Sequence, residues 1–432
     1  MATPGKTVFW FRRDLRLEDN VGFYHALQHS TEVIPIFIYD KNILDDLPRD
    51  DSRVAFIGTS LAKINEQLLA SNSCFATFYG DPLDIFQQLL TQNNINAVYA
   101  NKDYEPYATN RDAAVKDLLA SAGIRFELYK DQVLFEQNEV VKTDGTPYVV
   151  FTPYSRKWKQ ELRISGISSF PSESLLQNIG AHSYPFLTPG EFGFIDPIVT
   201  FPNFQISDGF AANYETVRNF PHLNQTTKLS VHLRFGTVSI RKIVALAMKE
   251  SDTFLNELIW REFFMQILWH FPFTVRRSFR PKYDAIRWRN NEAEFGAWCK
   301  GETGYPIVDA GMRELNATGF MQNRVRMITA SFLCKHLLID WRWGETYFAM
   351  KLLDYEQASN VGNWQWAAGS GVDAAPYFRI FNPSEQVKKF DKDLLYIQKW
   401  VPELNELTYP QPIVDHKEAR KRCLRVYKEA LG

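Results

Sequence analysis

Residues 7–11 read TVFWF, a short run of β-branched and aromatic side chains between polar segments. Such a run predicts a buried β-strand. Similar runs follow at VIPIFIY (33–39), CFATFYG (74–80), AVYA (97–100) and IRFELY (124–129). Helical patterns separate them, as at residues 54–70 and 109–123. This alternation predicts a doubly wound, Rossmann-like α/β domain with a parallel sheet over residues 1–130.

The chain changes character after residue 130. Pro, Gly and Ser recur over residues 131–205, where periodicity is weak, and we expect a connector packed on the surface. From residue 206 to 432 the pattern is helical, and stretches such as 255–271 and 323–341 carry apolar residues at helical spacing. We therefore expect a large all-α domain over residues 206–432.

Composition and motifs disfavour several classes of protein and site. The formal net charge is -1, so binding to nucleic acid would need a local basic patch. The 4 cysteines lie far apart, which argues against disulfides, structural zinc and iron–sulfur clusters and favours a reducing cytoplasm. The sequence has no signal peptide and no apolar run of about 18 residues, so no membrane span is expected. GxGxxG, HExxH, GxSxG and P-loop motifs do not occur, and we predict no metal site.

Aromatic residues make up 15% of the chain, which predicts wide flat apolar surfaces in a core or around a planar ligand. Residues 360–366 read NVGNWQW, and a helix here would point Trp364 and Trp366 to different faces, because two residues turn it by about 200°. Glu257 and Trp260 would share one face of another helix, which suits base recognition or an ordinary surface charge. The residues alone leave open whether the tryptophans fill a core, relay electrons or stack on a base.

Three polar stretches have both a structural and a functional interpretation. TTKLS (226–230) leads into a helical segment and fits an ordinary N-cap or a phosphate site at a helix N-terminus. Arg324 and Arg326 would leave a helix on different faces, and Arg326 could pair with Asp354 to position a charge. VRRSFRPK (275–282) fits a solvated loop or a contact with a phosphate backbone.

Long stretches of the chain resemble the photolyase/cryptochrome family, and most closely its class I cyclobutane pyrimidine dimer photolyases. They are WFRRDLRLEDN (10–20), LNELIWREF (255–263), TGYPIVDAGMRELNATGFMQNRVRM (303–327), ASFLCKHLLIDWRWGE (330–345) and NVGNWQWAAGSGVDAAPYFRIFNP (360–383). The resemblance implies an antenna-type N-terminal domain and a helical FAD-binding catalytic domain. It implies a light-dependent DNA repair lyase, monomeric and cytoplasmic, in which photoexcited reduced FAD transfers an electron to a flipped-out dimer in UV-damaged DNA.

The resemblance also implies the residues of a flavin site. By analogy, the residues that hold FAD are Tyr214, Thr226, Thr227, Lys228, Leu229, Ser230, Asn323, Arg326, Asp354, Glu356 and Asn360. Asn360 would face flavin N5 without adding charge, which suits repair, whereas plant-type cryptochromes tend to carry Asp there. Trp364, Trp341 and Trp288, in that order, would form an electron relay for photoreduction of the flavin.

A second set of residues would bind the damaged DNA. By the same analogy these are Arg218, Glu257, Trp260, Arg261, Asn323, Arg324, Trp366, Arg379 and Gln386. Trp366 would lie opposite Trp260 in the pocket that receives the flipped dimer. Glu257 would hydrogen-bond the bases and Met327 would pack on them, so the resemblance implies catalytic roles for Glu257, Asn360 and Met327.

Some positions depart from the family pattern. Gln322 and Phe320 stand where relatives usually carry His and Trp, and residues 320–327 contain no histidine, which argues against repair of (6-4) lesions. Folate-binding relatives carry Asn-Glu and Cys-Lys pairs where this chain has Tyr107-Ala108 and Val275-Arg276. A folate antenna is therefore disfavoured, and a second chromophore could be a deazaflavin or a second flavin, or be lacking.

Two alternative functions stay open. One is a cryptochrome-type blue-light photoreceptor without repair activity, and the other is a DASH-type relative that prefers single-stranded DNA. Cryptochromes often carry a long tail, whereas here the stretch after IFNP (380–383) is short and residues 388–404 have a folded pattern. That feature, with Asn360, Trp260 and Glu257, favours the repair enzyme.

Overall fold

A computed structural model describes residues 5–70, 73–92, 94–204 and 209–432 of the chain. The chain forms two compact units, each assembled from separate segments. The segments of unit 1 are residues 1–136, 162–204 and 229–246, and those of unit 2 are residues 137–161, 205–228 and 247–432. The two units share the expected connector, which contains helix α6 (Phe151–Ser165). The contiguous domain ranges stay a prediction.

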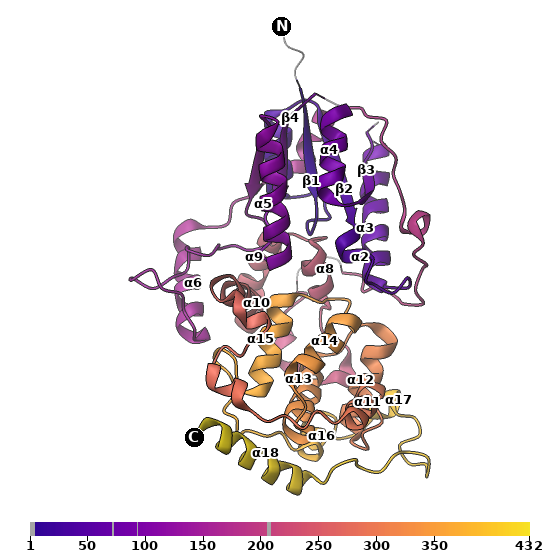
Figure 1. Ribbon diagram of the computed structural model, residues 1–432, viewed down its shortest axis with the longest axis vertical. Helices are drawn as coiled ribbons and strands as arrows, with labels where there is room; N and C mark the ends of the chain where they lie inside the picture. Colours follow the sequence, from indigo (N-terminus) through magenta and orange to yellow (C-terminus); the bar gives the residue numbers. More distant parts are fainter. Residues whose placement is uncertain (1–4, 71–72, 93, 205–208) are drawn as a thin grey trace. The chain divides into compact units, whose positions relative to one another are not determined.

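Unit 1 is built on a parallel five-stranded sheet in the order β3-β2-β1-β4-β5 (Figure 1). Its strands are β1 (Lys6–Phe11), β2 (Val33–Asp40), β3 (Ala76–Gly80), β4 (Ile95–Asn101) and β5 (Arg125–Tyr129). Thr7 of β1 is in register with Val33 of β2 and with Ala97 of β4. All five predicted strands are confirmed, and the order gives the doubly wound topology that the sequence predicts.

Helices cover both faces of this sheet, because alternate side chains of each strand are buried on opposite faces. On one face, Trp10 lies edge-on to Phe86 of α4 (Pro82–Gln92), at 5.1 Å between ring centroids, and α5 (Pro106–Ser121) lies beside α4. On the other face, Phe9 and Phe11 pack against Phe23 of α1 (Val21–His29). The period-2 pattern of TVFWF thus produces a two-sided core.

The segment that follows β1 forms a buried polar network in unit 1. Arg16 pairs with Asp131 at 2.7 Å, and Arg241 of α9 (Ile240–Glu250) pairs with the same carboxylate at 2.9 Å. Arg241 also pairs with Asp19 at 2.9 Å. Burial raises the pKa of Asp131, but the two guanidinium groups outweigh burial and bring this pKa below its ordinary value. One carboxylate therefore ties together three segments that are distant in sequence.

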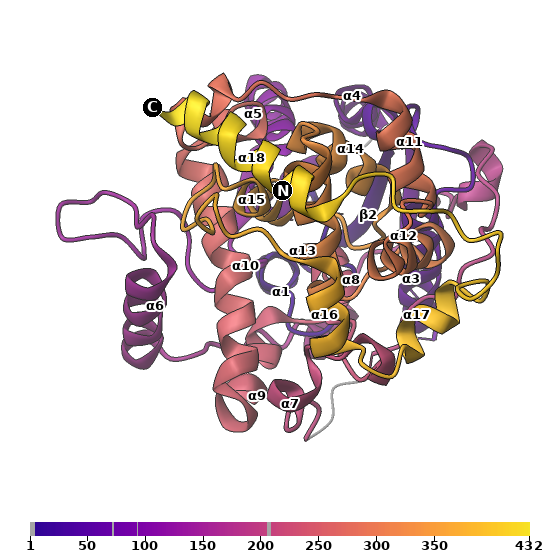
Figure 2. The ribbon, with the colours of Figure 1, turned by 90° about the horizontal axis from the view of Figure 1, so that it is seen from below.

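Unit 2 is helical, as the sequence predicts. Its helices include α7 (Tyr214–Val217), α10 (Asp252–His270), α11 (Glu292–Lys300), α12 (Pro306–Thr318), α13 (Asn323–Ser331), α14 (Trp341–Lys351), α15 (Gln357–Ala368), α16 (Pro383–Phe390), α17 (Leu395–Trp400) and α18 (His416–Leu431). Figure 2 shows α13, α14 and α15 close together, and these helices enclose an aromatic core that includes Trp298, Trp341 and Trp364. Among the described residues, no helix has both the length and the apolar character needed to cross a bilayer.

The helical pattern over residues 323–341 corresponds to three elements rather than one. The α13 helix passes into a π-helical turn (Phe332–Leu337), and Leu338 then adopts a φ of 51°, in the left-handed region. A left-handed residue ends a helix because its backbone cannot continue the right-handed turn. Helix α14 then starts at Trp341, with the side chain of Asp340 as its N-cap.

Asp131→Asn should lower the free energy of unfolding by about 3 kcal/mol, because two buried guanidinium groups would lose their shared counter-charge. This stabilisation is present above the unfolded pKa of Asp131 and is lost as pH falls through its lowered folded pKa. Chemical denaturation as a function of pH measures both effects. Asp117→Asn, at an exposed position of α5, is the matched control. Equal losses in the two variants would contradict the role given to Asp131.

Candidate functional site

Unit 2 contains a cavity lined by α13, α14, α15 and residues 352–356. Helix α13 contributes Asn323, Arg326, Met327 and Ala330, and steps of three and four residues place all of them on one helix face. The predicted site residues around this cavity are Asn323, Arg326, Met327, Asp354, Glu356, Asn360, Trp364 and Trp366. The structure thus brings together residues that the sequence separates by more than forty positions.

The predicted pair between Arg326 and Asp354 is present in the cavity wall. The guanidinium Nη2 lies 2.8 Å from Oδ2 of Asp354, and its Nε donates to the carbonyl of Met321 at 2.6 Å. The other carboxylate oxygen of Asp354, Oδ1, is buried and has no hydrogen-bond partner among the described residues. A buried acceptor without a partner is costly, so this atom is suited to a donor group of a ligand.

Asn360 is oriented by a residue that the sequence patterns did not reveal. Its Nδ2 donates to the carbonyl and to Oε1 of Glu345 on α14, at 3.0 and 2.9 Å. Burial raises the pKa of Glu345, and the bond from Asn360 lowers it in part. The amide oxygen of Asn360 keeps no protein partner within the described residues. It is therefore the atom that Asn360 can offer to a bound group.

Glu356 is also held in place by protein contacts. Its carboxylate accepts a hydrogen bond from Ser359 Oγ at 3.2 Å and lies 3.5 Å from Nη2 of Arg261. The structure therefore places Arg261, which was predicted to contact the substrate, next to a residue of the cavity wall. Its contact with DNA stays a prediction.

Helix α15 packs very closely against two neighbouring helices, α14 and α10. A Cβ atom added to Gly344 of α14 would overlap the ring of Trp364, and one added to Gly362 would overlap the ring of Phe264 on α10. Neighbouring helices therefore leave α15 little freedom to rotate. Residues 360–366 lie within helix α15, and both Trp364 and Trp366 line the cavity.

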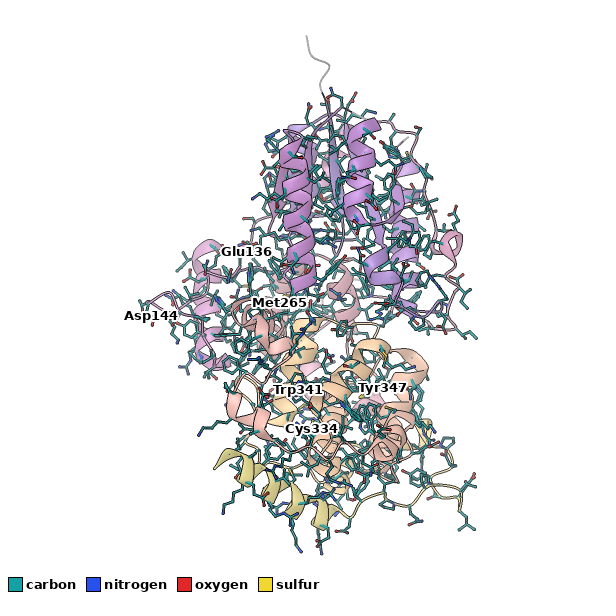
Figure 3. All side chains as sticks on the ribbon, in the orientation of Figure 1. Glu136, Asp144, Met265, Cys334, Trp341 and Tyr347 are labelled. Atoms are coloured by element: carbon teal, nitrogen blue, oxygen red, sulfur yellow. The ribbon has the colours of Figure 1, made fainter. Side chains whose placement is uncertain are left out.

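The predicted relay residues are in unit 2, but the ring contacts show an additional tryptophan. Trp364 lies edge-on to Trp298, at 6.1 Å between ring centroids, and Trp298 was missed by the sequence analysis. Trp341 is buried at the start of α14 (Figure 3), and Trp288 is half-buried and edge-on to Tyr427. The order Trp364, Trp341, Trp288 stays a prediction.

Several predicted substrate residues gather around Glu257 of α10. Arg218 pairs with Glu257 at 2.7 Å, and its guanidinium lies 5.3 Å from the ring centre of Tyr214. Burial raises the pKa of Glu257, and Arg218 acts in the opposite direction. Trp260 stacks face to face on Phe151, at 3.8 Å between centroids. None of these residues lines the cavity, so a pocket with Trp260 opposite Trp366 stays a prediction.

A basic group lies close to this end of unit 2. Arg324 donates to Asn219 Oδ1 at 2.8 Å and covers the ring of Phe390 at 4.5 Å. Burial lowers the pKa of Arg324, and the charges of Arg218 and Arg379 lower it further. Arg218 and Arg379 thus add positive charge near Arg324, and a local gathering of cations is of the kind that phosphate groups neutralise. Another predicted DNA contact, Gln386 on α16, is half-buried.

The predicted phosphate-binding stretch 226–230 precedes and begins helix α8 (Leu229–Phe235). Lys228 has a φ of 49°, and its ammonium lies 5.5 Å from the ring centre of Phe320. Neither contact involves a phosphate, so phosphate binding by residues 226–230 stays a prediction. In the described part of the chain, no group of His, Cys, Asp and Glu has the arrangement of a metal site.

Comparison with known proteins gives consistent matches. The family model described as DNA photolyase matches residues 7–174, and the model described as the FAD binding domain of DNA photolyase matches residues 254–408. A deoxyribodipyrimidine photo-lyase of Synechococcus sp. is 36% identical over 480 residues, which covers 99% of this chain and 97% of that relative.

Two solved structures extend the comparison. A bacterial class III photolyase from Agrobacterium tumefaciens has a TM-score of 0.89 at 34% identity, with 100% of this chain and 98% of that chain covered. An archaeal photolyase from Sulfolobus tokodaii, described as containing two FAD molecules, has a TM-score of 0.80 at 34% identity, with 98% and 100% covered.

Asn360→Asp should destabilise the protein by roughly 1–3 kcal/mol at neutral pH, because it replaces an amide donor with a carboxylate next to Glu345. Adjacent carboxylates raise each other's pKa. The loss should therefore be largest above the raised pKa and shrink as pH falls through it and the pair takes up a proton. Thermal unfolding at several pH values measures it, with Asn363→Asp, at an exposed position of α15 in the same cavity wall but not bonded to Glu345, as the control. A loss that does not vary with pH would contradict the Glu345 contact.

Proposed function

The chain belongs to the DNA photolyase family, and we propose that it splits cyclobutane pyrimidine dimers in DNA under blue light. The observation that carries this proposal is the unit 2 cavity, whose predicted residues all fall within the match to the FAD-binding domain at residues 254–408. Bound in its reduced form and excited by light, FAD supplies the electron that opens the cyclobutane ring and recovers it afterwards. The residues of this chain bind and orient the flavin and the dimer, and they exclude water from between them.

The groups around the cavity fit a flavin. Asp354 and Asn360 each keep an oxygen without a partner in the described chain, and these oxygens can accept hydrogen bonds from N–H groups of the isoalloxazine. Arg326, fixed by Asp354, supplies a positive charge that favours an anionic ring. Trp364 in the same wall offers an aromatic neighbour through which an electron can enter.

The other residues of the proposal act on the DNA. Glu257 accepts a hydrogen bond from the flipped bases, Trp260 and Trp366 provide flat apolar surfaces that replace base stacking, and Met327 packs on the bases. The basic group Arg218, Arg324 and Arg379, together with Gln386, contacts phosphates. Such contacts position a duplex without reading its sequence, as an enzyme that recognises lesions in any context requires.

The proposal includes several finer assignments. We assign the chain to class I, although the Agrobacterium structure is described as class III, and propose that it acts as a monomer in the cytoplasm. Residues 1–130 form an antenna-type domain, and residues 206–432 form the catalytic domain. A second chromophore has a precedent in the Sulfolobus structure, described as implying a novel light-harvesting cofactor.

The purified protein, reduced beforehand, should remove a single thymine dimer from a duplex oligonucleotide under blue light and not in the dark. Chromatography of the digested oligonucleotide measures dimer loss, and the absorption spectrum identifies the flavin and any second chromophore. A flavin band without repair would indicate a cryptochrome-type photoreceptor. Repair of single strands alone would indicate the DASH type.

Trp364→Phe should slow photoreduction of the flavin but spare repair once the flavin is reduced chemically, because phenylalanine cannot be oxidised at the potential that suffices for tryptophan. Flavin absorbance under continuous light measures the first effect, and the dimer assay measures the second. Trp400→Phe, a half-buried position on α17 outside the cavity wall, is the matched control. Equal loss of both activities would show that Trp364 is structural.

A further inference from the structure

Gln322 uses both ends of its amide to join two parts of unit 2. Its Oε1 accepts hydrogen bonds from the backbone N–H groups of Arg324 and Val325, at 2.7 and 3.3 Å, and so caps helix α13. Its Nε2 donates to the backbone carbonyl of Arg218. The side chain is only 6% exposed, so water competes poorly for these bonds.

Arg324 adds a second link between the same two segments. Its guanidinium donates to Asn219 Oδ1 from Nη2 at 2.8 Å and from Nε at 3.2 Å. Residues 218 and 219 are thus held to α13 at successive positions. Helix α7, which precedes them, has only 4 residues, so it cannot by itself fix the direction of Arg218.

The direction of Arg218 matters because its guanidinium pairs with Glu257 at 2.7 Å. The titratable groups of the described chain that interact with Glu257 are Arg218 and Tyr214. Burial and Glu257 raise the pKa of Tyr214 to about 12, so this phenol stays neutral at working pH. Arg218 is therefore the charge that opposes the rise that burial causes in the pKa of Glu257, and so favours the ionised carboxylate.

Building on the proposed function, we propose that Gln322 is a positioning residue for dimer recognition, acting on Glu257 through Arg218. An ionised carboxylate can accept the ring N–H of a flipped pyrimidine, whereas a protonated one loses much of this acceptor strength. The bond from Gln322 to the Arg218 backbone holds the guanidinium where it sustains the ionised form.

Gln322→Ser separates the two functions of the side chain. Serine keeps an oxygen that can cap α13, but it is too short to reach the carbonyl of Arg218. We expect unchanged flavin content, a small loss of thermal stability from the broken bond to the Arg218 carbonyl, and about 3–10-fold weaker binding to a duplex containing one thymine dimer in the dark. Asn291→Ser, which changes the N-cap of α11, is the matched control and should leave binding unchanged.

The pH dependence of binding provides a test that a purely structural role would not satisfy. Binding should weaken as pH falls through the pKa of Glu257. A less firmly held Arg218 lowers the pKa of Glu257 by less, so this pKa rises in Gln322→Ser. The loss of binding should therefore begin at a higher pH in this variant than in the wild type. In the double variant with Glu257→Gln, binding should be no weaker than in Glu257→Gln alone, because the two residues act on the same contact.

Additive losses in the double variant, or a pH profile like that of the wild type, would overturn the positioning role. If Gln322→Ser proves unstable, the same single and double variants are made with Gln322→Asn. Asparagine also caps helices, and it is also too short to reach the carbonyl of Arg218. Wild-type protein that binds damaged and undamaged duplexes equally would overturn the proposed function itself. That outcome is distinct from failure of the Gln322 assignment. In that case the wild type binds the damaged duplex more tightly than the undamaged one, and the Gln322 variants show the same preference.

Discussion

The fixed rotation of α15 is the constraint on which the candidate site depends. Gly344 and Gly362 allow the rings of Trp364 and Phe264 to approach so closely that no Cβ fits between them. A helix turns by about 100° per residue, so a slip of one position would move Asn360 away from Glu345 and Trp366 out of the cavity wall. Tight packing on two sides of α15 excludes that slip. The packing therefore fixes the positions of the polar side chains on α15, which need not stabilise the fold themselves.

Buried carboxylates in the two units differ in how completely the protein satisfies them, and this difference distinguishes a structural network from a binding site. In unit 1, Asp131 receives two guanidinium groups, and its pKa is lowered, as in a satisfied structural network. In unit 2, Asp354 keeps a buried oxygen without a partner in the described residues, and burial dominates the pKa of Glu257 despite Arg218. Incomplete satisfaction costs stability, and such sites are where a ligand can supply the missing partner.

Much of the fold could be predicted from the sequence because its signals are local. The strands follow from period-2 apolar runs such as TVFWF. The break at Leu338 could not be predicted, since leucine rarely adopts a left-handed conformation and nothing nearby marks it. Glu345 and the second bond of Gln322 also escaped detection. Their partners lie 15 and 104 positions away, beyond any helical repeat.

Helix α13 assigns side chains two positions apart to different surroundings. On α13, Arg326 pairs with Asp354 in the cavity wall while Arg324 holds Asn219 near the basic group. Two residues turn a helix by about 200°, so one rigid element can serve a cofactor on one side and a substrate contact on the other. In the proposed reaction the electron must cross between these two partners. Side chains mounted on common, tightly packed helices fix that separation more firmly than loops could.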